Sequence, residues 1–168
     1  MVAECTPVDR NPLPGSIAID LPDEAATAGL AKKLAAMLRI GDVVALHGDL
    51  GAGKTCLARA VIQALGDPEE HVPSPTFTLV QTYDLPDFTL WHFDLYRLES
   101  ADDAFELDIE EAFAAGVSLI EWPDRLGSWL PEAHLEIRLA ITNDGNSRRA
   151  VFSGAGDWRD RLTPLCNA

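Results

Sequence analysis

The sequence is short of cysteine, of long apolar runs and of basic residues, and each shortage excludes a class of protein. Its three cysteines, Cys5, Cys56 and Cys166, are too few and too widely spaced to indicate a disulfide framework or a zinc site. No apolar run approaches the roughly 20 residues that a membrane-spanning helix needs. The first residues lack the basic and apolar sections of a signal peptide. We therefore expect a cytoplasmic protein with no membrane association.

Basic side chains are outnumbered by acidic ones. Lysine and arginine number 13 against 27 acidic residues, which gives a formal net charge of −14. Such a surface repels a nucleic-acid backbone, and the basic clusters Arg148-Arg149 and Arg159 with Arg161 are sparse. We expect no direct high-affinity binding to nucleic acid. The acidity is typical of a soluble surface, and a face for a basic partner protein is the alternative interpretation.

The length and composition favour one folded domain. At 168 residues, 47% of them hydrophobic, the chain is long enough to bury a core without disulfides or a structural metal. Residues 1–15 contain Pro7, Pro12, Pro14 and Gly15 and are predicted to be a disordered tail. Residues 16–168 contain no internal repeat and no linker, so we expect them to form a single domain.

One stretch, Gly48-Asp49-Leu50-Gly51-Ala52-Gly53-Lys54-Thr55, matches the phosphate-binding pattern G-x-x-x-x-G-K-[ST] in full. A buried strand is predicted just before it and a helix just after it, which is the context this motif needs. The glycines allow successive N–H groups to point at phosphate oxygens, and the helix adds the positive end of its dipole. Lys54 supplies a charge for the β- and γ-phosphates, and Thr55 a hydroxyl for Mg²⁺. The chain is therefore predicted to bind a nucleotide.

The rest of the chain alternates between strand and helix patterns. Short loops at residues 84–87 and at Asn143-Asp144-Gly145-Asn146 predict two antiparallel hairpins. The predicted fold is an α/β, three-layer P-loop NTPase-like domain around a mixed sheet with a parallel core and antiparallel hairpins. The predicted strands are residues 16–21, 43–47, 76–83, 88–95, 117–120, 135–141 and 149–152, and the predicted helices are residues 23–39, 54–65, 102–115 and 157–162.

Two carboxylates stand where chemistry on a nucleotide needs them. Asp94 ends one predicted strand, and Glu121 ends the apolar run 117–120, the place of a Walker-B-type acid. An acid at the carboxyl end of a buried strand faces the ligand crevice of an open α/β sheet. Either residue alone is also explained as a strand-end acid that reaches water, but their pairing with the glycine-rich motif favours catalysis.

Ser74-Pro75-Thr76 carries hydroxyls on a proline-stiffened loop between the phosphate-binding motif and the Asp94 strand. This placement resembles a switch that senses a γ-phosphate, and an ordinary turn at the start of a strand is an equally good interpretation. A guanine site needs an Asn-Lys-x-Asp motif, and none of the three lysines lies in that context. Adenine is therefore the favoured base.

Together, four motifs resemble the TsaE family, also called YjeE. The motifs are Gly48 to Thr55, Ser74 to Val80, His92 to Leu98 and Ile120-Glu121-Trp122-Pro123. The resemblance implies a Mg²⁺-dependent ATPase required for the threonylcarbamoyl group on the adenosine beside the anticodon of tRNA. It also implies that the protein acts on a complex of TsaD and TsaB and does not perform the transfer itself.

The resemblance assigns roles to individual residues. Thr55 and Glu121 match the Mg²⁺ ligands of the family, and Asp94 matches its acid at the metal and hydrolysis site. Cys56 stands where the family usually has a second threonine, so a hydroxyl contact to the α-phosphate is lost and an N–H contact survives. Residues 22–27 match the segment near the adenine. The expected catalytic residues are Asp94, Glu121 and Lys54, the expected metal ligands are Thr55, Asp94 and Glu121, and the expected contacts to ATP or ADP are Asp49, Leu50, Gly51, Ala52, Gly53, Lys54, Thr55, Cys56 and Thr76.

Two other functions use the same nucleotide site. A small-molecule kinase would need an acceptor pocket and an arginine-bearing lid, and the sequence offers no clear lid. A nucleotide-gated scaffold, in which hydrolysis is incidental, is the non-enzymatic alternative.

Overall fold

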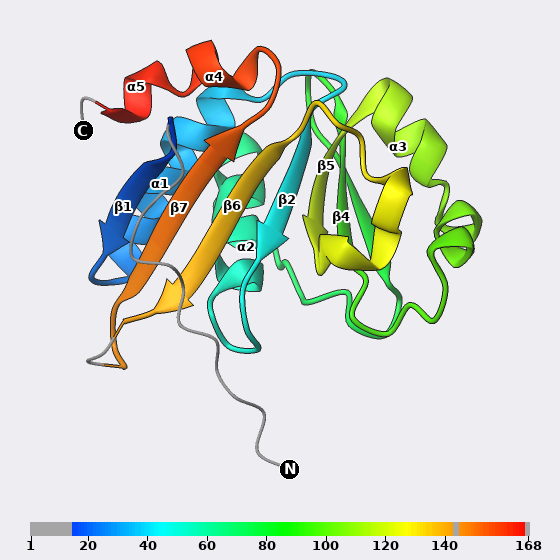
Figure 1. Ribbon diagram of the computed structural model, residues 1–168, viewed down its shortest axis with the longest axis horizontal. Coiled ribbons are helices and arrows are strands. Elements are labelled where there is room, and N and C mark those ends of the chain that lie inside the picture. The colour runs from blue at the N-terminus through cyan, green and yellow to red at the C-terminus, as the bar shows by residue number, and fades with distance from the viewer. Residues whose placement is uncertain (1–14, 143–144, 167–168) are drawn as a thin grey trace.

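The computed structural model describes residues 15–142 and 145–166, which form an α/β fold around one seven-stranded mixed sheet (Figure 1). The four central strands run parallel, and antiparallel strands flank them on both sides. The predicted fold class is confirmed. In spatial order the strands are β1 (Ile17–Leu21), β7 (Arg148–Gly154), β6 (Leu135–Ile141), β2 (Val43–His47), β5 (Gly116–Glu121), β4 (Thr89–Asp94) and β3 (Val80–Asp84).

Helices cover both faces of the sheet. On one face α1 (Glu24–Met37) and α2 (Lys54–Leu65) pack side by side, behind the sheet in Figure 1. On the other face α3 (Ile109–Ala115) and the 3₁₀ helices η1 (Ala101–Leu107) and η2 (Pro123–Trp129) pack near β2, β4 and β5. The chain ends with α4 (Trp158–Arg161) and α5 (Thr163–Cys166). No helix in the described ranges has the length and apolarity to span a bilayer.

The core consists of two clusters, one on each side of the sheet. Because β2 and β5 are buried on both faces, they read as continuous apolar runs in the sequence. Alternate residues of β5 point to opposite sides, so Leu119 joins the α1–α2 cluster and Ile120 joins the α3 cluster. The helices on both faces therefore pack against the same central strands, β2 and β5, and this packing holds the ends of those strands in place.

Most predicted elements are confirmed, and two are wrong in part. Residues 76–79 are a turn and not strand, because Leu79 takes a left-handed φ of 65° and its N–H bonds to the Pro75 carbonyl. The predicted helix 102–115 is broken at Asp108, which also has a left-handed φ, of 57°. Gly116, the expected helix stop, is also the first residue of β5. η2 has no counterpart among the predictions.

Two predictions fall wholly or partly outside the described residues. The disordered tail at 1–15 lies outside them except for Gly15. In the second hairpin, Asn143 and Asp144 of the expected turn lie outside as well, while the two strands that they join, β6 and β7, are paired in antiparallel register.

Candidate functional site

The motif Gly48 to Thr55, called the glycine loop below, connects the carboxyl end of β2 to the start of α2. Gly48, Gly51 and Gly53 have φ values of 149°, 81° and 105°, which side chains strongly disfavour. A Cβ on Gly48 would also lie 2.6 Å from the backbone oxygen of Leu139 in β6. Glycine is thus required at these positions for the loop to curl over the sheet edge.

Lys54 points back into the glycine loop. Its ammonium group donates to the carbonyl oxygens of Gly48 and Asp49, at 2.5 Å and 2.9 Å. The same group lies 4.3 Å from the centre of the Trp122 ring, within the range of a cation–π contact. Burial lowers the pKa of Lys54, and the neighbouring carboxylates, Glu121 first, act in the opposite direction. The Lys54 ammonium is therefore held at the glycine loop, within the electrostatic influence of Glu121, Asp94 and Asp49.

Thr55 and Glu121 meet across the gap between α2 and β5. The Thr55 hydroxyl lies 2.9 Å and 3.0 Å from the two carboxylate oxygens of Glu121. Nε2 of His92, on the neighbouring strand β4, lies 2.8 Å from Oε1 of Glu121. Glu121 is 3% exposed and His92 is fully buried. The carboxylate is held between a hydroxyl and an imidazole, so its direction is set by two elements at once.

Asp94 ends β4 and stands directly beside Glu121 in the parallel β4–β5 register. One of its carboxylate oxygens lies 3.4 Å from the hydroxyls of both Ser74 and Thr76, which lie 2.8 Å from each other. The other oxygen accepts from the Tyr96 N–H at 3.2 Å. The loop from Ser74 to Thr76 therefore reaches the sheet edge beside the two acids.

Trp122 follows Glu121 in a left-handed conformation, with φ 58° and ψ 50°. This conformation is uncommon for a bulky residue and costs free energy. It turns the indole ring against the Tyr96 ring, with 4.9 Å between ring centres, and under the Lys54 ammonium. The strained residue thus forms one wall of the site.

These residues enclose a cleft of about 220 Å³ at the carboxyl edge of the sheet. Most of the expected site residues line it, while the side chain of Ala52 is buried in the core and Asp49 contributes its carbonyl to Lys54. Residues 22–27 do not line it. The lining residues are Leu50, Gly51, Gly53, Lys54, Thr55, Cys56, Ser74, Thr76, Asp94, Tyr96, Glu121 and Trp122.

Sequence reasoning missed three contacts in this cleft. The position of His92 two residues before Asp94 puts both on one strand face, but its bond to Glu121 depends on the β4–β5 register, which the sequence does not specify. The contact of Trp122 with Lys54 depends on a backbone conformation that no pattern in the sequence specifies. Tyr96, in the turn that follows β4, joins the wall by packing against the Trp122 ring.

The expected metal ligands in the cleft, Thr55, Asp94 and Glu121, offer only oxygen donors, namely one hydroxyl and two carboxylates. Hard cations such as Mg²⁺ take oxygen ligands, usually one or two carboxylates together with waters and phosphate oxygens. Within residues 15–142 and 145–166, no group of three or more histidine, cysteine or acidic side chains is arranged to hold a metal ion by itself. The donor set thus fits a cation that is shared with a phosphate ligand.

A model of the family "Threonylcarbamoyl adenosine biosynthesis protein TsaE" matches residues 21–151. Three curated relatives bear the name tRNA threonylcarbamoyladenosine biosynthesis protein TsaE. The Rickettsia bellii protein is 41% identical over 124 residues, which cover 74% of this chain and 86% of that protein. The Treponema pallidum protein is 43% identical (68% and 84% covered), and the Bacillus subtilis protein is 37% identical (81% and 84% covered).

Among solved structures, a crystal structure of YdiB from Bacillus subtilis is similar to this fold, with a TM-score of 0.73. The sequence identity is 29%, and the match covers 90% of this chain and 94% of that one. The matched family region contains every residue that lines the cleft, while α4 and α5 lie beyond it.

Proposed function

This chain belongs to the TsaE family of tRNA threonylcarbamoyladenosine biosynthesis proteins, as its four motifs predict, and from this premise we propose that it is a Mg²⁺-dependent ATPase. One observation carries the proposal: Thr55 of the glycine loop contacts Glu121, and Asp94 stands beside it at the sheet edge. A phosphate-binding loop and two acids thus share one cleft.

The glycine loop and Lys54 would hold the phosphates. The loop supplies backbone N–H groups beside the start of α2, where the helix dipole favours negative charge. Lys54 would exchange its bonds to the Gly48 and Asp49 carbonyls for phosphate oxygens. Burial lowers the pKa of its ammonium group, and an anion at the loop would favour the protonated form.

Thr55, Glu121 and Asp94 would hold Mg²⁺, which neutralises charge on the phosphate oxygens. The Thr55 hydroxyl and the Glu121 carboxylate already lie within hydrogen-bonding distance of each other, so both point to one position. Asp94 or Glu121 would order the attacking water and accept its proton. Ser74 and Thr76 contact Asp94 and would hold its carboxylate toward a phosphate ligand in the cleft.

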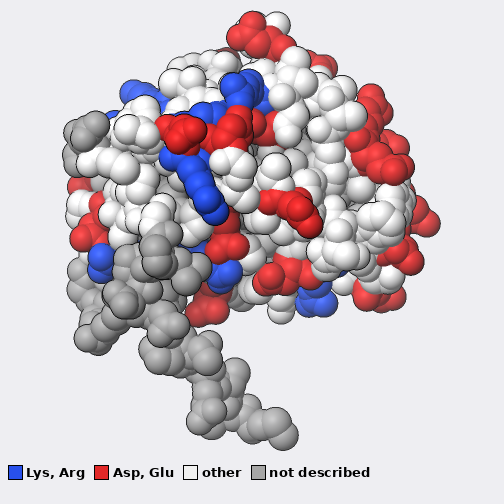
Figure 2. Space-filling view, turned by 45° about the horizontal axis from the view of Figure 1, so that its top comes forward, with Lys and Arg blue, Asp and Glu red and all other residues white. Residues whose placement is uncertain are grey.

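The charge distribution supports a role for partner proteins in holding the tRNA. Residues 99–111 carry seven acidic and no basic side chains, and acidic side chains line the side of the molecule on which α3 lies (Figure 2). A phosphate backbone is repelled by such a surface. In keeping with the family resemblance, we propose that TsaD and TsaB are the partners and that hydrolysis acts on their complex.

Removal of either acid tests the catalytic assignment. Glu121→Ala and Asp94→Ala should each lower kcat for ATP hydrolysis by at least about 100-fold, as expected when a group that acts in the transition state is lost. Glu110→Ala, which removes an exposed acid of α3, is the matched control and should keep full activity. Wild-type turnover in both acid variants would refute the roles of Asp94 and Glu121.

ATPase assays with and without the TsaD–TsaB complex separate the three functions. Strong stimulation by the complex supports the proposed role. Phosphate passed to a small metabolite, with indifference to the complex, would indicate a kinase instead. Complex assembly that requires ATP but proceeds unchanged with the Glu121→Ala variant would indicate a nucleotide-gated scaffold.

A further inference from the structure

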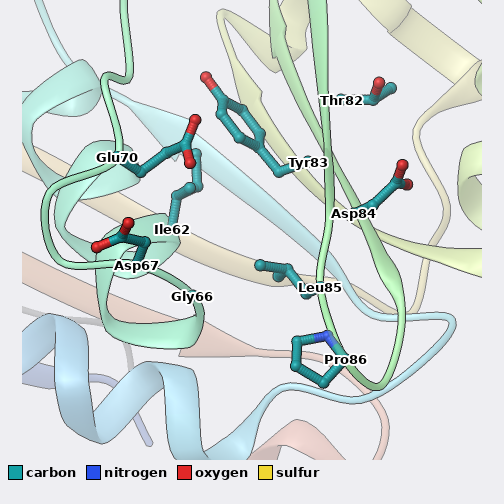
Figure 3. Close-up of a pocket in the computed structure, with 9 residues that line it drawn as sticks. All are labelled: Ile62, Gly66, Asp67, Glu70, Thr82, Tyr83, Asp84, Leu85 and Pro86. Atoms are coloured by element: carbon teal, nitrogen blue, oxygen red, sulfur yellow. The ribbon is translucent and has the colours of Figure 1, made fainter.

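A second cleft lies at the other end of α2, between the C-terminus of this helix and the β3–β4 hairpin (Figure 3). Its volume is about 320 Å³, which falls within the range of small-molecule sites. It shares no lining residue with the cleft at the glycine loop. The function proposed above therefore makes no use of it.

The lining of this second cleft is apolar at its floor and acidic at its rim. Ile62 of α2 and Leu85 of the hairpin supply aliphatic surface. Asp67, Glu70 and Asp84 supply three exposed carboxylates, and no lysine or arginine is among the described residues that line the cleft. An occupant with both a methylene chain and a positive charge would match both parts of this lining.

Tyr83 of β3 gives an independent indication of a ligand. Only 9% of this residue is exposed to solvent. Its hydroxyl has no hydrogen-bond partner in the described part of the chain. Figure 3 shows the ring extending from β3 toward Glu70, across the cleft. A buried hydroxyl without a partner costs free energy, so this group is poised to bind a donor that enters the cleft.

The protonation of Tyr83 suits this role. Burial raises the pKa of the phenol and the negative charge of Glu70 raises it further, while the positive charge of Arg59 opposes the rise. The hydroxyl therefore stays neutral at physiological pH and can accept a hydrogen bond from a cation. A compact metal ion fits less well, because within the described residues no three acidic or histidine side chains converge on one point.

We propose that this cleft binds an aliphatic ammonium group. The methylene chain would lie on Ile62 and Leu85, and the nitrogen would donate to the Tyr83 hydroxyl and to the carboxylate of Glu70. The same chemistry has two sources, a free diamine or the lysine side chain of a partner protein. The three carboxylates are spread along the rim and do not converge on one point. This arrangement suits an alkyl ammonium group that lies on the apolar floor better than a small inorganic cation.

NMR titration of the full chain tests the site, with 1,4-diaminobutane and Nα-acetyl-lysine amide as the charged probes and 1-butanol as the uncharged one. Saturable shifts are expected for amides between residues 66 and 70 and between 81 and 85. Glu70→Gln and Tyr83→Phe should each weaken the binding of a charged probe about tenfold. Glu110→Gln removes the same charge from α3 and should leave binding unchanged within twofold.

Each outcome decides the proposal. Tighter binding of the diamine supports a free ligand, tighter binding of the capped lysine supports a partner side chain, and either result supports the site. Non-saturable shifts overturn it, as do equal effects of Glu70→Gln and Glu110→Gln or equal binding of 1-butanol. Glu70 is exposed, so its variant keeps the fold, and the dispersion of the amide spectrum checks Tyr83→Phe. None of these readouts depends on nucleotide binding.

Discussion

Glu121 receives hydrogen bonds from two side chains on different elements, Thr55 on α2 and His92 on β4. Since the carboxylate only accepts, Nε2 of His92 carries the proton, and Nδ1 is left buried with no partner in the described part of the chain. Among the described residues, the hydrogen bond to Glu121 is therefore the one that the His92 ring makes. Its contribution is to orient a carboxylate that is expected to bind the metal, as outer-shell groups do at metal sites.

Replacement of His92 should therefore change the metal requirement of ATP hydrolysis. His92→Leu removes the donor and should raise the Mg²⁺ concentration for half-maximal activity about tenfold or more. His92→Gln keeps an amide donor and should retain most of the wild-type requirement. A magnesium titration at saturating ATP measures both variants, with circular dichroism to verify the fold. An unchanged requirement in His92→Leu would show that Thr55 alone positions Glu121.

The candidate site was largely predictable at the level of single residues. Lys54, Thr55, Asp94 and Glu121 were expected in one site because of their types and positions in the chain, and all four line one cleft. The contacts between them were not predictable, since they depend on the pairing of β4 with β5. A register shift by one residue would have turned Asp94 away from the cleft, and no local pattern specifies that register.

Among the elements, predictions held where the local signals agree with the tertiary fold. The predicted helix 23–39 forms, and Asp23 caps it by accepting from the Ala26 N–H at 2.8 Å, as aspartate does at many helix starts. The segment after Ser100 has helical spacing, but it divides at Asp108 so that η1 and α3 can take different directions. Periodicity records which residues are buried and does not record a change in helix direction between them.

Two glycines give a contrasting test of element stability. Gly29 lies exposed in α1, and a Cβ there would meet no atom within 4 Å, so Gly29→Ala should stabilise the protein by about 0.5–1 kcal/mol. In Gly116→Ala, the Cβ would lie 2.6 Å from the Thr89 carbonyl oxygen and 2.8 Å from the Trp91 ring. This overpacking should destabilise by about 2 kcal/mol.

Urea denaturation of the two glycine variants measures both effects. The result would contradict the packing argument if the two substitutions changed the free energy of unfolding in the same direction.

For the whole molecule, a buried ion pair helps to hold the C-terminal helices on the central sheet, together with the core side chains Trp158, Leu162 and Leu165. Both terminal nitrogens of the Arg161 guanidinium, Nη1 and Nη2, donate to Asp42, just before β2, and the pair is mostly buried, at 15% and 8% side-chain exposure. The guanidinium also stacks on Trp158, 3.7 Å from the ring centre. The hydrogen bond to Asp42 is the largest influence on Arg161 and raises its pKa, so the guanidinium stays charged.

Arg161→Met should destabilise the fold by about 3 kcal/mol, because it leaves the Asp42 carboxylate buried without its partner. Arg159→Met, which changes an exposed arginine of the same helix, is the control and should change stability by no more than about 0.5 kcal/mol. The double variant Asp42→Asn with Arg161→Met should recover part of the loss. Thermal and urea unfolding measure all three, and an equal loss in the control would contradict the argument.

The pH dependence of folding should include a contribution from His47, at the end of β2. Burial has the largest effect and lowers the pKa of His47 from its usual value of 6.5. The charge of Arg138 lowers it further, and the charges of Glu136 and Asp124 raise it. His134, the remaining neighbour, also lowers it. Because the unfolded state then binds more protons, this stability is complete above about pH 6.5 and is lost as pH falls through the folded-state pKa.

Unfolding free energies between pH 8 and pH 5 check this contribution, as a difference between the wild type and His47→Gln. The difference removes the effect of the many other acids in a chain of net charge −14. The wild type should lose more stability than the variant as the solution is acidified. Parallel curves would show that His47 titrates alike in both states.

Lys54 already gives hydrogen bonds to two carbonyl oxygens of its own loop. Those acceptors are tethered a few residues away, so their effective concentration is far above that of any free solute. A single weak anion therefore competes poorly for the ammonium group. A ligand that offers several linked oxygen atoms can displace both carbonyls in one event, so we expect the loop to favour anions with several linked oxygens over single weak anions.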